Sequence, residues 1–138
     1  MSYIAPYITF NGNCREAMTF YKDSIGGELA ITTMAEAPGG DKAPPEEKKK
    51  IMHAALRKDA IILMASDNMG GGPEKHGNNV NIMYNCDSEA EIKRLFPKLS
   101  AGGKVHHPLK EEFWGSVFGD FTDKFGMRWM LNWDKPKS

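Results

Sequence analysis

The sequence predicts an α+β fold made of two similar modules, each with the order strand–helix–strand–strand–strand. The first observation is an internal repeat: "APYITFNGNCREAMTFYKDSIGGELAI" near the start is matched by "NVNIMYNCDSEAEIKRLFPKLSAGGKVHH" in the second half. The offset is roughly 73 to 76 residues, which is typical of duplicated supersecondary units. The second observation is that each half continues in alternating, strand-like segments. One helix cannot cover both faces of a sheet, so we expect the two modules to pair around a shared hollow.

The first module begins with a short apolar strand and an amphipathic helix. Asn13 is expected to cap this helix together with Glu16, and Gly26-Gly27 to end it. Lys58-Asp59 is expected to form a hairpin turn. The strands expected after the helix are Glu28–Glu36, Ile51–Arg57 and Ala60–Ser66.

Two segments rich in glycine and proline separate these elements. Residues 37–50, "APGGDKAPPEEKKK", predict an exposed loop, and Gly70-Gly71-Gly72-Pro73 interrupts regular structure in the hinge 66–79. The sequence therefore predicts one domain, 1–138, made of modules 1–68 and 79–138 joined by a Gly-rich hinge, 69–78.

The second module repeats the pattern. Ser88 and Glu91 predict a capping box, and Gly102-Gly103 a helix end, while Pro97 is a local misfit inside the helix. The strands expected here are Lys104–Leu109, Phe113–Phe118 and Met127–Trp133. In the last strand Trp129, Leu131 and Trp133 share the face expected to lie under the helix.

Composition excludes several classes of protein. The 138 residues carry no net charge and no basic stripe, which argues against a nucleic-acid partner. Neither a membrane-spanning apolar run nor a signal-peptide pattern is present, so we expect no membrane partner. Two cysteines, Cys14 and Cys86, make no disulfide framework. These features together predict a cytoplasmic protein.

Three stretches carry a resemblance to a known family: "PYITFNGNCREAMTFYKDSIGG", "HAALRKDAIILMASD" and "EEFWGSVFGDFTDKFGMRWMLN". They resemble the PhnB-like branch of the vicinal-oxygen-chelate superfamily, which also holds glyoxalase I, bleomycin-resistance proteins and extradiol dioxygenases. The resemblance runs from about Tyr3 to Trp133. It implies tandem βαβββ modules that form an open, cup-shaped mixed sheet, in a homodimer. Labels on this branch mention phosphonate metabolism and 3-demethylubiquinone methyltransferase, but no Gly-rich nucleotide loop supports methyl transfer here.

The resemblance also implies where a metal would bind. Relatives that use a divalent ion hold it with His, Glu or Gln from the first and last strands of each module. The matching positions here are Pro6 or Tyr7, Leu63 or Met64, Val80 or Asn81, and Met130. None is a usual ligand for such an ion, so we expect no metal and no cofactor.

The last strand and the aromatic residues before it supply candidate ligand-binding groups. Met130 is expected to line the cavity, while Arg128 and Asn132 face either the cavity or solvent. Phe113 and Trp114 belong either to the core or to a pocket wall. In the second case we expect affinity to depend mainly on Trp114.

Further candidates are weaker. His53 is either a structural histidine or a cavity-lining base, and Asp67 is expected only to cap a turn. His106 and His107 are adjacent on a strand and are expected to point to opposite faces. Cys14, at a helix N-terminus, could be a stabilised thiolate, although no nearby histidine supports a nucleophile.

Two functions remain open from the sequence. The first is a metal-independent protein that binds a small molecule in the cup, with Phe113, Trp114, Met130, His53 and Arg128 as ligand-binding candidates. The second is a lyase-, isomerase- or dioxygenase-type enzyme acting on a small oxygenated substrate, with His53 and Glu111 or Glu112 as an acid/base pair.

Overall fold

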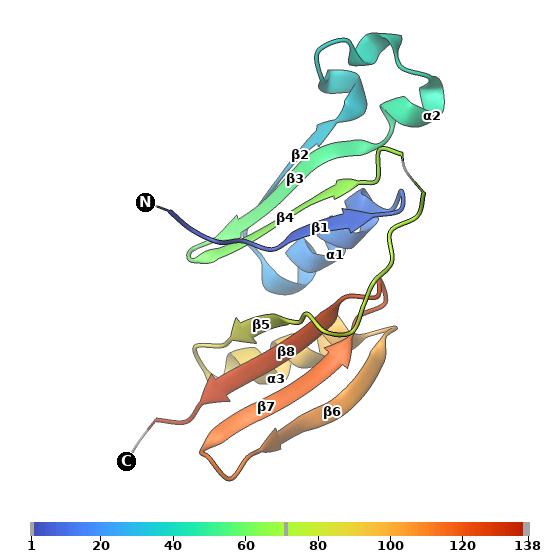
Figure 1. Cartoon of the computed structure of the whole chain (residues 1–138). Coiled ribbons are helices and arrows are strands. Elements are labelled where there is room, and N and C mark those ends of the chain that lie inside the picture. Colours follow the sequence, from blue (N-terminus) through green and yellow to red (C-terminus); the bar gives the residue numbers. More distant parts are fainter. Residues whose placement is uncertain (1, 71, 137–138) are drawn as a thin grey trace. The chain divides into compact units, whose positions relative to one another are not determined.

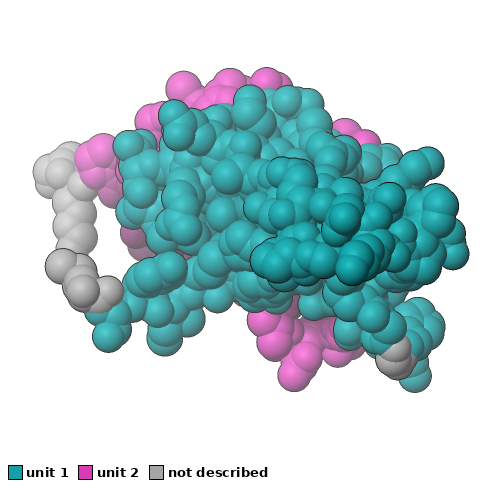
Figure 2. All heavy atoms as spheres, turned by 90° about the horizontal axis from the view of Figure 1, so that it is seen from above, with its two compact units in different colours: residues 1–75 teal, residues 76–138 magenta. Residues whose placement is uncertain are grey.

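A computed structural model describes residues 2–70 and 72–136 of the chain. The chain forms two compact units, residues 1–75 and 76–138 (Figures 1 and 2). Each unit contains one four-stranded sheet with a twelve-residue helix against it, which confirms the predicted α+β fold of tandem βαβββ modules. Within the described residues no helix is long and apolar enough to cross a membrane.

In the first unit the sheet has the strand order β1-β4-β3-β2. Strand β1 runs parallel to β4, and the other neighbours are antiparallel. The elements are β1 (Tyr7–Phe10), α1 (Cys14–Ile25), β2 (Glu28–Thr33), β3 (Ile51–Lys58) and β4 (Ile61–Asp67).

In the second unit the order is β5-β8-β7-β6, again with its first strand parallel to its last. This equivalence is the structural counterpart of the sequence repeat. The elements are β5 (Ile82–Asn85), α3 (Glu89–Ser100), β6 (Lys104–Glu111), β7 (Ser116–Thr122) and β8 (Arg128–Asp134).

The predicted strands differ from the observed ones at their ends. Strand β2 stops at Thr33 because the Glu36 carboxylate accepts hydrogen bonds from the Thr33 amide and hydroxyl, which starts a short 3-10 turn at residues 34–36. The predicted loop 37–50 contains a second 3-10 turn, η2 (Gly40–Lys42), and a one-turn helix, α2 (Pro45–Lys48). Strand β7 begins at Ser116, since Phe113 belongs to the turn before it.

Each helix covers one face of its own sheet and makes that face the core. Helix α1 packs on β2, β3 and β4, and helix α3 on β6, β7 and β8. The largest fully buried side chains include Phe10, Met18, Tyr21, Leu56, Leu95, Phe121, Trp129 and Leu131. In the described part of each unit no helix covers the opposite face of the sheet, so that face holds the positions available for a site.

Asp67 caps helix α1 from the end of β4. Its Oδ1 accepts from the Cys14 amide at 2.9 Å and its Oδ2 from the Ile51 amide at 2.8 Å, and the residue is only 2% exposed. The expected Asn13–Glu16 box is therefore wrong, and Asn13 makes no side-chain cap hydrogen bond. A carboxylate from a distant strand end satisfies the free amide instead.

The cap of helix α3 is closer to the capping box that the sequence predicts. The Ser88 hydroxyl accepts from the Glu91 amide at 3.0 Å. The Glu91 carboxylate returns to the Asp87 amide at 2.7 Å rather than to the amide of Ser88, and it also accepts from the Tyr84 hydroxyl at 3.1 Å. Burial and the Glu91 charge raise the pKa of Tyr84. The helix continues through Pro97 to Ser100.

The second glycine of each Gly-Gly pair lies against the backbone of its own sheet. A Cβ on Gly27 would come within 2.5 Å of the Arg57 carbonyl oxygen, and one on Gly103 within 2.1 Å of the Thr122 carbonyl oxygen. Any larger side chain would push the strand that follows each helix away from its neighbour.

Candidate functional site

The predicted ligand-binding aromatics lie at a hairpin tip. Phe113 and Trp114 form the turn between β6 and β7, with 95% and 57% exposure, and their rings meet edge to face at 5.0 Å between centroids. Strand β7 runs from this turn to Thr122, which pairs with Arg128. Seven residues of strand span about 20 Å, so the structure does not bring Trp114 together with Arg128.

His53 has a partner within the first unit. Its Nδ1 lies 3.3 Å from the Tyr7 hydroxyl, and the two rings are 5.8 Å apart between centroids. Glu111, its proposed partner in catalysis, pairs with Lys135 at 2.8 Å in the second unit, whereas Glu112 lies at the start of the β6–β7 turn. The structure thus gives His53 and Glu111 separate polar partners.

The positions expected to carry a metal lie where first and last strands pair. Tyr7 pairs with Met64 in the first unit, and Met130 pairs with Met83 in the second. Met83 thus takes the place beside Met130, while Val80 and Asn81 precede strand β5. Within the described residues no three His, Cys, Asp or Glu side chains are grouped so that they could hold a metal ion. Metal independence stays a prediction.

Neither cysteine is activated. Burial, followed by the nearby Asp67 carboxylate, raises the pKa of Cys14 to about 12. Burial, followed by Glu91 and Asp87, raises the pKa of Cys86 to about 12 as well. The expected effect of the helix N-terminus on Cys14 is therefore outweighed, because a charge is costly to bury beside a carboxylate.

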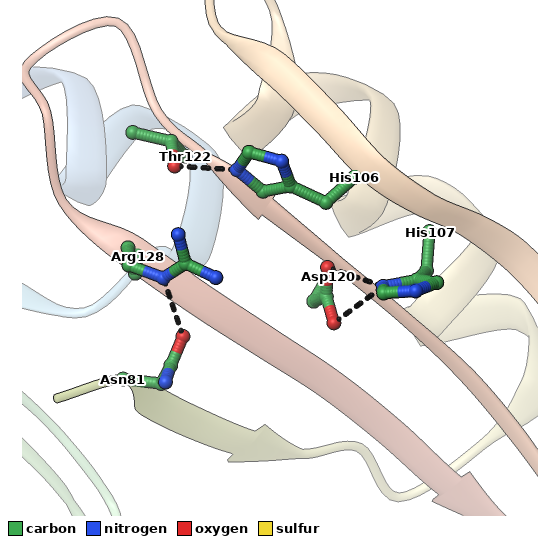
Figure 3. A network of polar contacts seen from close by, with 6 residues as sticks. All are labelled: Asn81, His106, His107, Asp120, Thr122 and Arg128. Carbon is green, nitrogen blue, oxygen red and sulfur yellow. Dashed lines mark hydrogen bonds and ion pairs between the residues drawn. The ribbon is translucent and has the colours of Figure 1, made fainter. Parts of the chain in front are cut away.

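A cluster of polar side chains lies instead on the open face of the second sheet. We call it the polar face, and it comprises Asn81, His106, His107, Asp120, Thr122 and Arg128 (Figure 3). Alternation along β7 and β8 creates it, since Phe121 and Trp129 are buried under the helix and their neighbours point the other way. The burial of Trp129 and Leu131 fits the expected alternation of the last strand, which places Arg128, Met130 and Asn132 on the other face, although Asn132 is itself buried. A ligand-binding role for these residues stays a prediction.

A β-bulge places both adjacent histidines on this face. Val105 pairs with Phe121 and His107 with Asp120, so β6 advances by two residues while β7 advances by one. His106 is the extra residue, and a bulge of this kind re-aims side chains that would otherwise alternate. The prediction that His106 and His107 point to opposite faces is therefore wrong.

Each histidine is fixed by a neighbour on β7. His106 Nε2 lies 2.8 Å from the Thr122 hydroxyl oxygen. His107 Nδ1 lies 3.0 Å from both carboxylate oxygens of Asp120. The Asp120 side chain is 11% exposed whereas that of His107 is 73% exposed, so a largely covered carboxylate holds an accessible imidazole.

Arg128 lies at one end of the polar face, beside a hollow. Its Nε donates to the Asn81 side-chain oxygen at 3.2 Å, and Figure 3 shows the end of the guanidinium directed toward the side where His106 and Asp120 lie. The hollow has a volume of about 450 Å³ and is lined by His76, Gly77, Asn78, Thr122, Gly126 and Arg128. None of these described lining residues carries a carboxylate, so the charge of the hollow favours an anion.

Gly126 leaves space for the His76 side chain, which lines this hollow. Its φ is +89°, and a Cβ there would come within 2.6 Å of Nδ1 of His76. The predicted turn at residues 123–126 is confirmed, with the Gly126 amide donating to the Asp123 carbonyl at 3.0 Å.

The sequence singled out Arg128 as a ligand-binding candidate and Asn81 only as a possible metal position, and it did not single out Asp120 or Thr122. A signal was present in "HHP", because Pro108 inside a strand pattern indicates an edge strand or a bulge. Strand β6 is indeed the edge of its sheet.

Solved structures show what the chain is similar to. Protein PA1353 from Pseudomonas aeruginosa is 43% identical, with a TM-score of 0.87 over 99% of this chain and 100% of that one. A PhnB protein from Bacillus cereus is 25% identical, with a TM-score of 0.79 over 96% and 99%. A glyoxalase/bleomycin resistance protein/dioxygenase family enzyme from Burkholderia phytofirmans, 11% identical with a TM-score of 0.64 over 95% and 97%, shares the fold.

Comparison with known sequences points to the same family as the solved structures. Protein YjdN of Escherichia coli is 32% identical over 94% of this chain and 93% of its own length. Residues 2–132 match the family described as 3-demethylubiquinone-9 3-methyltransferase. The chain therefore belongs to that family, within the PhnB-like branch of the vicinal-oxygen-chelate superfamily.

Proposed function

We propose that this protein binds a small organic anion on the polar face of its second unit, without a metal ion. The observation that carries the proposal is the Arg128 side chain, which is held through Nε by Asn81. It lies beside a hollow whose lining, among the described residues, includes no carboxylate. A guanidinium is always charged and presents its donors in a plane that matches a carboxylate or a phosphonate.

The bond from Nε to Asn81 matters for affinity. It fixes the plane of the guanidinium before a ligand arrives, so less side-chain entropy is lost on binding. The terminal nitrogens lie on the side of the polar face where His106 and Asp120 stand (Figure 3).

An apolar surface lies next to this charge. Met130 follows Arg128 by two residues on β8, and Phe118 lies on the same face of β7, two residues before Asp120. Both are partly exposed. The Met130 thioether near the guanidinium, with the Phe118 ring further along the same face, suits a molecule with one anionic end and a short apolar body.

The test compares benzoate with its neutral isostere benzamide, by calorimetry or by NMR titration. We expect benzoate alone to bind, and Arg128→Ala to weaken it by about 10- to 100-fold, as for the loss of hydrogen bonds to a charged partner. Addition of a chelator should leave the affinity unchanged.

Arg94→Ala is the matched control. It removes the same charge from the exposed side of helix α3, on the other face of the sheet. Equal binding of benzoate and benzamide, or equal loss in both variants, would contradict a site built on Arg128.

A further inference from the structure

We propose that His107, positioned by Asp120, is a catalytic base that takes a proton from a small 2-oxo acid held at Arg128. The inference rests on the proposed function, because Arg128 must hold the carboxylate of the substrate. It goes beyond that function by assigning a chemical step.

The hydrogen bonds of His107 define which nitrogen can act. Both oxygens of Asp120 lie 3.0 Å from Nδ1, and a carboxylate only accepts, so the proton of the neutral ring is on Nδ1. The lone pair is then on Nε2, on an imidazole that is 73% exposed. A carboxylate that fixes the tautomer and stabilises the imidazolium is the arrangement that makes histidine an effective base.

Asp120 is well supported in this role. It is a buried residue in the middle of β7, with Met130 beside it on β8 and His107 beside it on β6. Its position is fixed by two strand ladders, whereas the imidazole that it holds extends into solvent. Asp120 is therefore a positioning residue, and His107 is the group that would contact the substrate.

The distance between His107 and Arg128 sets the size of the substrate. His107 pairs with Asp120, whose partner on β8 is Met130, two residues from Arg128. Two strand spacings across and two residues along separate the Cα atoms by roughly 12 Å. The side chains of His107 and Arg128 extend from these Cα atoms. The distance left between the imidazole and the guanidinium then fits a molecule of a few carbon atoms.

The charged and titratable groups around this imidazole come from three strands. Asp120 on β7 accepts from it, Arg128 on β8 directs its guanidinium toward the same area, and His106 on β6 is held by Thr122 (Figure 3). The carboxylate of a bound acid would thus contact Arg128, and the rest of the acid would lie near the imidazoles of His106 and His107.

The step balances without a further reactant. A C–H bond at C3 of the 2-oxo acid breaks, its electron pair forms the C2–C3 double bond of an enolate, and the carbonyl pair moves onto oxygen. The proton goes to Nε2 of His107, and Asp120 compensates the charge of the imidazolium. Return of a proton from the same nitrogen regenerates the acid. In D2O this cycle exchanges hydrogen for deuterium at C3.

The experiment follows this exchange in 2-oxobutanoate by proton NMR, with the full-length protein and with equal imidazole in protein-free buffer. We expect the protein to accelerate exchange by about 100-fold over the buffer, within the range of a positioned general base. His107→Gln should lose the acceleration and still bind benzoate and 2-oxobutanoate as the wild type does.

Asp120→Asn tests the positioning role. It should lower kcat at least about tenfold with little change in KM. It should also change the nitrogen-15 NMR signature of His107 from a single Nδ1-protonated tautomer to a mixture. A contact that is only structural would change neither the tautomer nor kcat. Asp134→Asn, an exposed change on β8, is the control and should leave the rate unchanged.

The outcomes separate this inference from the proposed function. If 2-oxobutanoate binds but wild type and His107→Gln exchange it equally, the catalytic assignment is wrong and the anion site stands. If benzoate binds and 2-oxobutanoate does not, the substrate class is wrong. If no anion binds, both proposals fail.

Discussion

The carboxylate of Asp123 accepts a hydrogen bond from the indole Nε1 of Trp129 at 2.8 Å, across the turn that joins β7 to β8. The same carboxylate accepts from the amides of Phe125 and Met127, at 2.8 and 3.0 Å. Asp123 is 3% exposed and Trp129 is 1% exposed. One buried acid therefore fixes both the turn and the largest core side chain of the second unit, directly before Arg128.

Removal of the Asp123 carboxylate is expected to destabilise the folded protein. Asp123→Ala should lower the free energy of unfolding by about 2–4 kcal/mol, because one buried and two partly buried donors lose their acceptor. Urea denaturation at neutral pH measures the change. Trp129→Phe removes only the indole donor, and the double variant should cost less than the sum of the two single variants. Strict additivity would mean that the two side chains are not coupled.

Asp67 should be equally sensitive in the first unit. Asp67→Asn replaces one carboxylate oxygen by an amide that cannot accept from Cys14 or Ile51, and we expect a loss of about 2–3 kcal/mol. Asp59→Asn, in the exposed β3–β4 turn, is the matched control and should stay within about 0.5 kcal/mol. A similar small effect at both positions would show that the cap contributes little.

The buried thiols predict a dependence of stability on alkaline pH. In the folded state the pKa of Cys14 and that of Cys86 are both about 12, against an ordinary value of 9.0. Between these values the unfolded chain releases protons that the folded chain retains, so stability falls as pH rises above about 9. Denaturant midpoints from pH 8 to pH 10.5 test this, and the slope should decrease in the Cys14→Ala/Cys86→Ala variant. Alkylation of the folded protein at pH 8 should be slow, and rapid labelling would contradict the burial.

Trp114 should matter little for binding at the polar face. The ring lies at the β6–β7 turn, about a full strand length from Arg128. We expect Trp114→Ala to change the affinity for benzoate by less than about twofold, against 10- to 100-fold for Arg128→Ala. A large loss in the tryptophan variant would restore the sequence-based expectation that this aromatic dominates affinity.

Sequence periodicity was sufficient for the elements and for the faces of the last strand. Trp129 and Leu131 are buried as their spacing predicts, and Arg128 lies on the other face. Local signals worked where the partner was local, as with Ser88 and Glu91 at the start of α3. They did not work for helix α1, because its cap, Asp67, comes from a strand 53 residues further along the chain.

The site was harder to predict than the fold. Perfect alternation separates His106 from His107, and Pro108 indicates an edge strand or a bulge without giving the residue at which a bulge lies. Asp120 has no motif around it, and its role depends on pairing with His107 across two strands. Such relationships are created by register, which is set when the whole sheet forms.

The extra residue at His106 also bears on how such a site could arise and be lost. Strand β6 has a neighbour only on one side, so gaining or losing one residue there disturbs a single ladder and leaves β7 and β8 in register. A one-residue insertion or deletion in β6 would therefore change which side chains share the polar face without disturbing the rest of the sheet. Deletion of His106 should therefore keep the fold, remove the imidazole that contacts Thr122 and leave His107 opposite Asp120.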